Sequence, residues 1–424
     1  MKSQLRKILL AHLLFALFVP TAVLGNPSTA DLNKLYVAKQ YFDLRDALRS
    51  YADPRNVELL FYSGVVHNKF NRPDLSIKFL NSYLSQNESR QNTPKRIACY
   101  ELLADNYRKS YQYRKAADVY KTLLTRFRTT VKASEIQDYE NSAELWSALA
   151  DVPPQTTTFK ADSFVIQDKD DQLPLEINGQ RIALFFDSGA NLSVVTSSLA
   201  QRLGLQIKEA SIDVVAVAGN KVKAKLAVAK EIRLGNISIR NSVFLVFSDA
   251  DLFVSEANFQ INGLIGFPVI ESLNEITFVR GKGISVPAKA SKGGEQNMVL
   301  DGLNPVVAGW YKGDRLSFSF DTGATTTILY PPFFKRYEAD VKSTYETHTE
   351  RVRGVGGHKE IEGYLGKDLV ISISGKPGHF KQVAILTQPT NASSDYLYGN
   401  LGQDLIQQFE KTTMNFKAMS LVFN

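Results

Sequence analysis

Two aspartates, Asp187 and Asp321, follow similar stretches of sequence whose residue types suit acid–base chemistry. Each follows an apolar, Phe-rich run and is followed by a hydroxyl residue, a glycine and an alanine, in the order Asp187-Ser188-Gly189-Ala190 and Asp321-Thr322-Gly323-Ala324. Ordinary residue usage gives one such tetrapeptide in about one or two per cent of chains of this length. Two of them, each after a predicted strand, therefore indicate two halves of one site.

The chemistry expected of such a pair is activation of water. Two carboxylates held close together cannot both ionise cheaply, so they share one proton. The charged member can take a proton from water while the protonated member polarises a substrate carbonyl. We expect the glycines to allow close backbone approach and the hydroxyls of Ser188 and Thr322 to bond across the pair, with the small Ala190 and Ala324 fitting a tight turn. Taken singly, either aspartate would more simply be a structural hydrogen-bond acceptor.

The N-terminal residues have the pattern of a secretory signal. Lys2, Arg6 and Lys7 precede an apolar run of twelve residues, which is followed by small residues up to Gly25. We therefore predict a signal peptide at residues 1–25 and an exported protein, periplasmic or secreted. The alternative is an uncleaved membrane anchor, although the run is shorter than the ~20 residues that a membrane span needs.

Residues 28–150 are predicted to form an all-α domain of helical hairpins. Apolar and small residues recur at spacings of three and four, and prolines at positions 54, 73 and 94 mark the breaks. Helices are expected at 75–85, 97–110 and 113–126. The pairs resemble tetratricopeptide repeats, with small residues where helices cross, and the alternative is a plain helical bundle. This region is expected to bind a protein partner, to present substrate, or to cover the cleft that holds the two aspartates.

Beyond a Pro/Thr-rich linker at 151–159, the periodicity changes from helical to strand-like and Gly-containing turns become frequent. This β region reads as a duplication. Gly219 follows Asp187 by 32 residues and Gly354 follows Asp321 by 33, each within a candidate hairpin. An apolar-apolar-Gly or Asn-Leu-Gly element ends at Gly266 and Gly402, 79 and 81 residues after the respective aspartate. We predict two lobes, 160–287 and 288–424, related by pseudo-twofold symmetry.

These motifs resemble the aspartic peptidases of the pepsin–retropepsin superfamily. The resemblance covers residues from about 160 to 424 and implies an all-β, bilobal acid-protease fold in which Asp187 and Asp321 form the catalytic pair. It implies that Gly266 and Gly402 lie in elements that support the two loops. It also implies two flaps over the substrate, formed around Val217, Ala218, Gly219, Asn220, Gly354, Val355, Gly356 and Gly357.

The chain departs from the family's pattern in three ways. The first hairpin lacks the flap tyrosine of pepsins, and Asp321 follows Asp187 by 134 residues, a shorter spacing than in pepsin-like chains. Two fused retropepsin-like lobes are therefore expected, so that a monomer completes the site. Pro268 replaces a residue that is commonly polar, with an effect on packing that the sequence does not fix.

Composition and cysteine count exclude several other classes. A hydrophobic fraction of 44% and a charged fraction of 22% indicate a folded chain, and the formal charge of +7 includes no Lys/Arg block of the kind that binds nucleic acid. Cys99 is the only cysteine, so an internal disulfide is impossible and a buried structural thiol is expected. The five histidines have no metal-ligand spacing, so no metal or cofactor is expected.

The sequence thus predicts an exported aspartic endopeptidase whose substrate is a polypeptide. The alternative is a non-hydrolytic peptide-binding or scaffold protein that keeps the fold. Retention of both carboxylates and both hydroxyls favours the enzyme, because a binder has no need of a proton-sharing pair.

Overall fold

The computed structural model describes residues 28–50, 56–86, 93–168, 170–215, 221–254, 258–354 and 357–424. The predicted signal peptide lies outside these ranges. Before the sheets come seven described helices: α1 (Thr29–Val37), α2 (Tyr41–Arg49), α3 (Val57–Lys69), α4 (Pro73–Gln86), α5 (Thr93–Lys109), α6 (Tyr113–Phe127) and α7 (Ala133–Ala148). The predicted helical N-terminal region is confirmed.

Local sequence signals set the ends of these helices. The side chain of Ser28 caps α1 and that of Asn56 caps α3, each accepting a hydrogen bond from a free N–H of the first turn. Pro73 begins α4, where its missing N–H costs nothing. Asn71 and Tyr111 adopt left-handed backbone angles, with φ of 53° and 56°, in the turns before α4 and α6. These tight turns return each helix antiparallel to its neighbour.

The first large sheet has eight strands. Their order is β1 (Thr156–Phe159), β8 (Ile237–Phe247), β5 (Ser193–Thr196), β11 (Gly263–Ile265), β4 (Gln180–Phe186), β3 (Leu173–Ile177), β7 (Lys221–Leu234) and β6 (Gln206–Val215). A short pair of strands, β9 (Phe253–Val254) and β10 (Phe259–Gln260), and two helices, α8 (Ser197–Arg202) and α9 (Phe267–Glu271), accompany it. Part of the predicted linker therefore forms β1, in keeping with its β-branched threonines.

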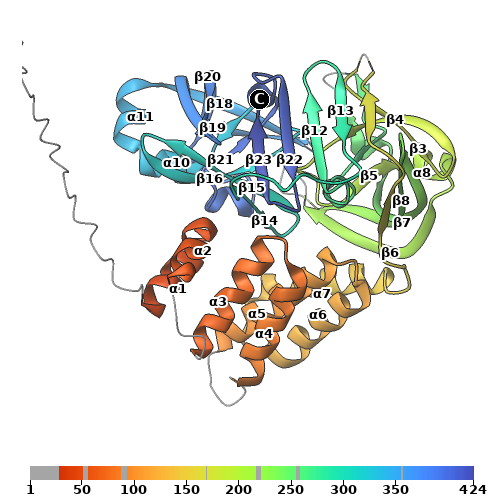
Figure 1. The fold of residues 1–424 in the computed structure, drawn as a ribbon, viewed down its shortest axis with the longest axis horizontal. Coiled ribbons are helices and arrows are strands. Elements are labelled where there is room, and N and C mark those ends of the chain that lie inside the picture. The colour runs from red at the N-terminus through yellow and green to blue at the C-terminus, as the bar shows by residue number, and fades with distance from the viewer. Residues whose placement is uncertain are drawn as a thin grey trace, which may run out of the picture.

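The second large sheet also has eight strands. Their order is β14 (Met298–Asp301), β15 (Asn304–Tyr311), β16 (Asp314–Phe320), β21 (Gly399–Leu401), β17 (Ile328–Leu329), β20 (Lys376–Leu386), β19 (Gly357–Ile373) and β18 (Glu346–Gly354). Its helices are α10 (Pro331–Arg336), α11 (Glu338–Thr344) and α12 (Gln403–Ile406). A five-stranded sheet, between the two larger sheets in Figure 1, combines β2 (Ser163–Ile166), β13 (Gly283–Val286), β12 (Glu275–Val279), β22 (Lys411–Asn415) and β23 (Ser420–Phe423).

The helical region lies along one side of the β region, under both large sheets (Figure 1). Phe42 and Phe70 from the helices belong to the same buried apolar cluster as Leu300 and Leu303, which flank the turn after β14. A helical layer that shares a core with the sheets loses apolar burial if it separates from them. Among the described residues, no helix is both long and apolar enough to cross a membrane.

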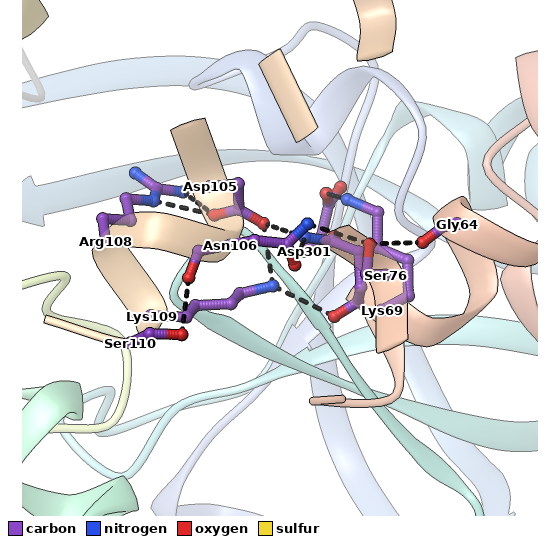
Figure 2. A network of polar contacts seen from close by, with 10 residues as sticks. Gly64, Lys69, Ser76, Asp105, Asn106, Arg108, Lys109, Ser110 and Asp301 are labelled. Atoms are coloured by element: carbon purple, nitrogen blue, oxygen red, sulfur yellow. Dashed lines mark hydrogen bonds and ion pairs between the residues drawn. The ribbon is translucent and has the colours of Figure 1, made fainter. Parts of the chain in front are cut away.

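Buried charges also join the helices to the second large sheet (Figure 2). Lys69, at the end of α3, is 6% exposed and forms an ion pair with Asp301 at the end of β14. Asp105 in α5 accepts from Asn68 at 2.8 Å and pairs with Lys109 at 2.8 Å. Because each of these charges is buried beside an opposite charge or a hydrogen-bond donor, the network can be stable away from water. It fixes the helical layer against β14.

Candidate active site

Strands β4 and β16 deliver the two aspartates in the same way. The end of β4 pairs in parallel with β11, and Asp187 N donates to the carbonyl oxygen of Ile265 at 2.9 Å. The end of β16 pairs in parallel with β21, and Asp321 N donates to the carbonyl oxygen of Leu401 at 3.0 Å. Each aspartate therefore sits where a strand leaves the sheet, with its backbone held by the element that contains the predicted supporting glycine.

Backbone N–H groups of each turn hold the carboxylates. Oδ1 of Asp187 accepts from Gly189 N at 2.8 Å and from Ala190 N at 3.1 Å. Oδ1 of Asp321 accepts from Gly323 N at 2.9 Å and from Ala324 N at 3.2 Å. In both turns, Oδ2 is left free of these backbone contacts.

The hydroxyls of Ser188 and Thr322 connect the two turns. Ser188 Oγ accepts from Thr322 N at 3.0 Å and donates to the carbonyl oxygen of Phe320 at 2.9 Å. Thr322 Oγ1 accepts from Ser188 N at 3.0 Å and donates to the carbonyl oxygen of Phe186 at 2.8 Å. Both side chains are buried. The structure thus brings together two turns that are 134 residues apart in the chain.

The two glycines lie against the opposite carboxylates. A Cβ atom placed on Gly189 would lie 2.6 Å from Cγ of Asp321, and one placed on Gly323 would overlap the carboxyl group of Asp187. Such contacts are too short for real atoms. Glycine is therefore needed here because each carboxyl group packs against the backbone of the other turn.

The electrostatics of the pair follow from this proximity. Burial, together with the charge of Asp321 and a hydrogen bond to it, raises the pKa of Asp187 to about 7. The N–H groups of Gly189 and Ala190 oppose this rise. Asp187 therefore keeps a proton in mildly acidic solution, where an ordinary aspartate would have lost it.

Gly266 and Gly402 pack directly behind the two turns. Gly266 N donates to Ser193 Oγ and Gly402 N donates to Thr327 Oγ1, each at 3.0 Å. A Cβ on Gly266 would lie 2.5 Å from the carbonyl oxygen of Leu192, and one on Gly402 would lie 2.7 Å from that of Ala324. Both glycines thus let the supporting backbone approach the loop that carries the aspartate.

Two hairpins correspond to the predicted flaps. Strands β6 and β7 form the first, but Val217, Ala218, Gly219 and Asn220 lie outside the described residues. Strands β18 and β19 form the second, in which Gly354 pairs with Gly357 across the tip, while Val355 and Gly356 lie outside the described residues. Each hairpin belongs to the same sheet as one of the aspartate-bearing strands.

Sequence reasoning missed two contacts near the site. Asn400 Nδ2 donates to Asp321 Oδ2 at 3.1 Å, whereas the sequence predicts a supporting role only for the glycine of the Asn-Leu-Gly element. Pro268 lies in the first turn of α9, and its carbonyl oxygen accepts from Tyr111 Oη at 3.2 Å and from Gln155 Nε2 at 2.9 Å. The unusual proline therefore lies at a contact with the helical layer, whereas the corresponding Asp404 accepts from Thr327 N at 2.9 Å.

Other candidate chemistry is limited. In the described part of the chain, no three His, Cys, Asp or Glu side chains are grouped as metal ligands. Cys99 is fully buried, as predicted, and burial raises the pKa of its thiol. Such a thiol is a poor nucleophile, because little of it is ionised near neutral pH.

Comparisons with known proteins bear on part of this site. Residues 173–269 match the model of a family described as aspartyl protease. This range resembles an aspartyl protease. It contains Asp187 and Gly266, so the match supports an aspartic protease fold for the region. No curated protein matches the chain.

Two solved structures are similar to parts of the chain. One is a retropepsin-like aspartic protease from Rickettsia conorii, at 17% identity and a TM-score of 0.21, with 31% of this chain and 93% of that chain covered. The other is the EIAV protease complexed with the inhibitor HBY-793, at 20% identity and a TM-score of 0.19, with 25% of this chain and 86% of that chain covered.

Proposed function

We propose that this protein is an exported aspartic endopeptidase in which Asp187 and Asp321 activate water to hydrolyse peptide bonds. The observation that carries the proposal is the pair of crossed hydroxyl contacts between Ser188 and Thr322, which packs each aspartate turn against the other carboxyl group. Parallel pairing of β11 with β4 and of β21 with β16 supports two pseudo-symmetric lobes in one chain. The apolar N-terminal pattern supports export.

The reaction needs one proton on the pair. The charged carboxylate takes a proton from water, whose oxygen attacks the peptide carbonyl carbon, while the other carboxyl protonates the carbonyl oxygen. The tetrahedral intermediate has two hydroxyl groups on one carbon. When the C–N bond breaks, the nitrogen receives a proton and the remaining oxygens form a carboxylic acid. No covalent enzyme intermediate forms, so the pair itself needs only to exchange protons.

The helical region is proposed to be a tetratricopeptide-like module that docks a partner or substrate. A Cβ on Gly64 in α3 would lie 2.6 Å from Cδ2 of Leu80 in α4, which supports the need for a small residue where these helices cross. Ala116 and Ala117 in α6 are also buried. The likeness concerns helix packing, and nothing in it requires catalysis.

The direct test is to incubate the purified mature protein with denatured protein and a peptide library from pH 3 to 8. Cleavage is expected with the native chain and should fall at least a hundredfold in Asp187→Asn and Asp321→Asn, since acid–base groups contribute about 10²–10⁴-fold. Both variants keep the size of the side chain. Cleavage that persists in either variant would overturn the assignment. Peptide binding without cleavage would instead support a peptide-binding protein.

A further inference from the structure

The two half-sites differ at one pair of facing residues near the aspartates. In β21, Asn400 precedes Leu401 and Gly402, whereas Leu264 occupies the corresponding position in β11. The strand pairing supports this equivalence, because Asn400 lies opposite Ser319 and Leu264 lies opposite Phe185, each two residues before its aspartate. One half-site therefore has a Ser–Asn pair where the other has Phe–Leu.

The Ser–Asn pair reaches Asp321 in a defined orientation. Ser319 Oγ lies 2.6 Å from Asn400 Oδ1 and 3.2 Å from the carbonyl oxygen of Gly399, so its proton goes to the nearer Asn400 Oδ1. Asn400 Nδ2 donates to Asp321 Oδ2 at 3.1 Å. A hydroxyl that donates to the amide oxygen leaves the amide nitrogen facing the carboxylate. Ser319 is buried, which protects this arrangement from water.

The contact distinguishes the two carboxyl groups chemically. Asp321 receives backbone N–H donors at Oδ1 and the amide donor of Asn400 at Oδ2. Asp187 receives the matching backbone donors at Oδ1, but the hydrocarbon side chain of Leu264 has no donor to offer Oδ2. A donor directed at a carboxylate stabilises its charged form.

We propose that Asn400 is a positioning residue that keeps Asp321 as the carboxylate and leaves the shared proton on Asp187. For its catalytic consequence this rests on the proposed function: Asp321 is then the base that takes a proton from water, and Asp187 is the acid that protonates the carbonyl oxygen. The fold alone, with its two similar turns, does not distinguish these roles.

The surrounding groups agree with this assignment. Asp187 faces Asp321 across the pair, and its pKa is raised to about 7 by burial and by the charge of Asp321. Tyr330, at the start of α10, lies close enough for the charge of Asp321 to act on it. Burial and that charge raise the pKa of Tyr330 to about 12, so its phenol stays neutral while the pair titrates.

The test follows the carboxyl ¹³C signals of both aspartates with pH in the substrate-free full chain. Asp187→Asn and Asp321→Asn assign the signals. In the native protein, the first deprotonation should appear mainly at Asp321 and the second mainly at Asp187. In Asn400→Leu, both signals should move in both steps. The first step should also shift upward by about one pH unit, because a hydrogen bond to a charged group is worth about that much.

Further variants keep the test decisive. Ser319→Ala frees the amide to turn and should give a smaller shift in the same direction, even if Asn400→Leu does not fold. Phe185→Ser with Leu264→Asn offers Asp187 the same donor and should also spread the proton over both groups. Gln382→Leu replaces an exposed amide on β20 and should leave both titrations unchanged.

The outcomes separate this inference from the proposed function. Unchanged titration of both carboxyls in folded Asn400→Leu overturns the role of Asn400, even if the native protein cleaves peptides. The expected titrations in a protein that cleaves no peptide would support the proton placement and overturn the endopeptidase. If the protein is active, the acid limb of kcat/KM in Asn400→Leu should move upward with the first step.

Discussion

Ser188 and Thr322 exchange hydrogen bonds in both directions, since each side-chain oxygen accepts from the other residue's backbone N–H at 3.0 Å. Each hydroxyl also donates to a carbonyl oxygen on the opposite strand, that of Phe320 or Phe186. Four hydrogen bonds therefore cross between the turns and hold the two carboxyl groups together. The geometry of the proposed pair depends on these two small residues as much as on the aspartates.

Ser188→Ala and Thr322→Ala should each destabilise the protein by about 1–3 kcal/mol, because each leaves a buried N–H and a buried carbonyl unpaired. Urea unfolding measures this loss, and peptide cleavage should fall as the turns separate. Thr322→Ser keeps the hydroxyl and is the matched control, expected to retain most of the activity. Equal losses in Thr322→Ser and Thr322→Ala would show that the hydroxyl is not the important group.

Gly189→Ala should abolish cleavage, because its methyl would collide with the carboxyl group of Asp321. The free energy of unfolding should change less than the rate of cleavage. Gly294→Ala is the control, since a Cβ there meets no atom within 4 Å. Steady-state kinetics and thermal unfolding of both variants provide the comparison. Normal cleavage by folded Gly189→Ala would mean that the two turns lie farther apart in solution.

The sequence was sufficient to predict the helical region, the β region and the strand-to-turn placement of both aspartates. Each of these depends on local patterns: apolar periodicity, proline breaks and a repeated tetrapeptide. The supporting contacts of Gly266 and Gly402 were also foreseeable, because a glycine at matching offsets indicates close backbone approach.

The sequence could not reveal contacts that depend on distant segments. Pairing of β12 with β22 in the five-stranded sheet joins residues about 140 positions apart. The ion pair of Lys69 with Asp301 carries no local signal, since either residue alone reads as a surface charge. The contact of Asn400 with Asp321 could not be predicted for the same reason, because strand pairing is what brings Ser319 and Asp321 next to Asn400.

Catalysis should depend on the proton held by Asp187. The pKa of this group is raised to about 7, so the acid form is present below that pH and is lost as pH rises through it. We expect kcat/KM to fall above about pH 7. The free energy of unfolding should also fall as pH rises from about 4 to 7, because in this range the folded protein holds a proton that the unfolded chain releases.

Measurements of cleavage and urea unfolding from pH 3 to 9 test both expectations. Asp187→Asn cannot ionise at this position, so its stability should lose that part of the pH dependence. A native protein whose stability does not change between pH 4 and 7, or whose change is the same in Asp187→Asn, would contradict the raised pKa.

Lys69→Met should destabilise the protein by about 1–3 kcal/mol, because Asp301 loses its nearest cation and keeps only Lys39 at 3.7 Å and the hydroxyl of Tyr396 at 2.6 Å. The pKa of Asp301 is held below its usual range by Lys69 and Lys39. This contribution is therefore present above the unfolded pKa of about 3.9 and is lost as pH falls below it.

Two comparisons isolate the buried pair in urea unfolding. Lys69→Met with Asp301→Leu removes both charges and should recover much of the loss. Lys342→Met breaks an exposed ion pair with Glu338 in α11 and should cost less than about 1 kcal/mol. If Lys69→Met costs no more than Lys342→Met, the buried network does not fasten the helical layer to β14.

Asn141 of α7 pairs with the backbone of Asp213 in β6, the edge strand of the first large sheet. Its Oδ1 accepts from Asp213 N at 3.0 Å and its Nδ2 donates to Asp213 O at 3.1 Å, so the amide acts as an added strand partner. Asn141→Ala should therefore loosen the β6–β7 hairpin. We expect faster amide hydrogen exchange in residues 206–215 and a several-fold higher KM, with kcat little changed because the aspartate turns are untouched.

Gln137→Ala, an exposed change on the same helix, is the control. Unchanged exchange in Asn141→Ala would show that the helical layer does not restrain this hairpin, whereas an equal loss of kcat would place the effect at the aspartates.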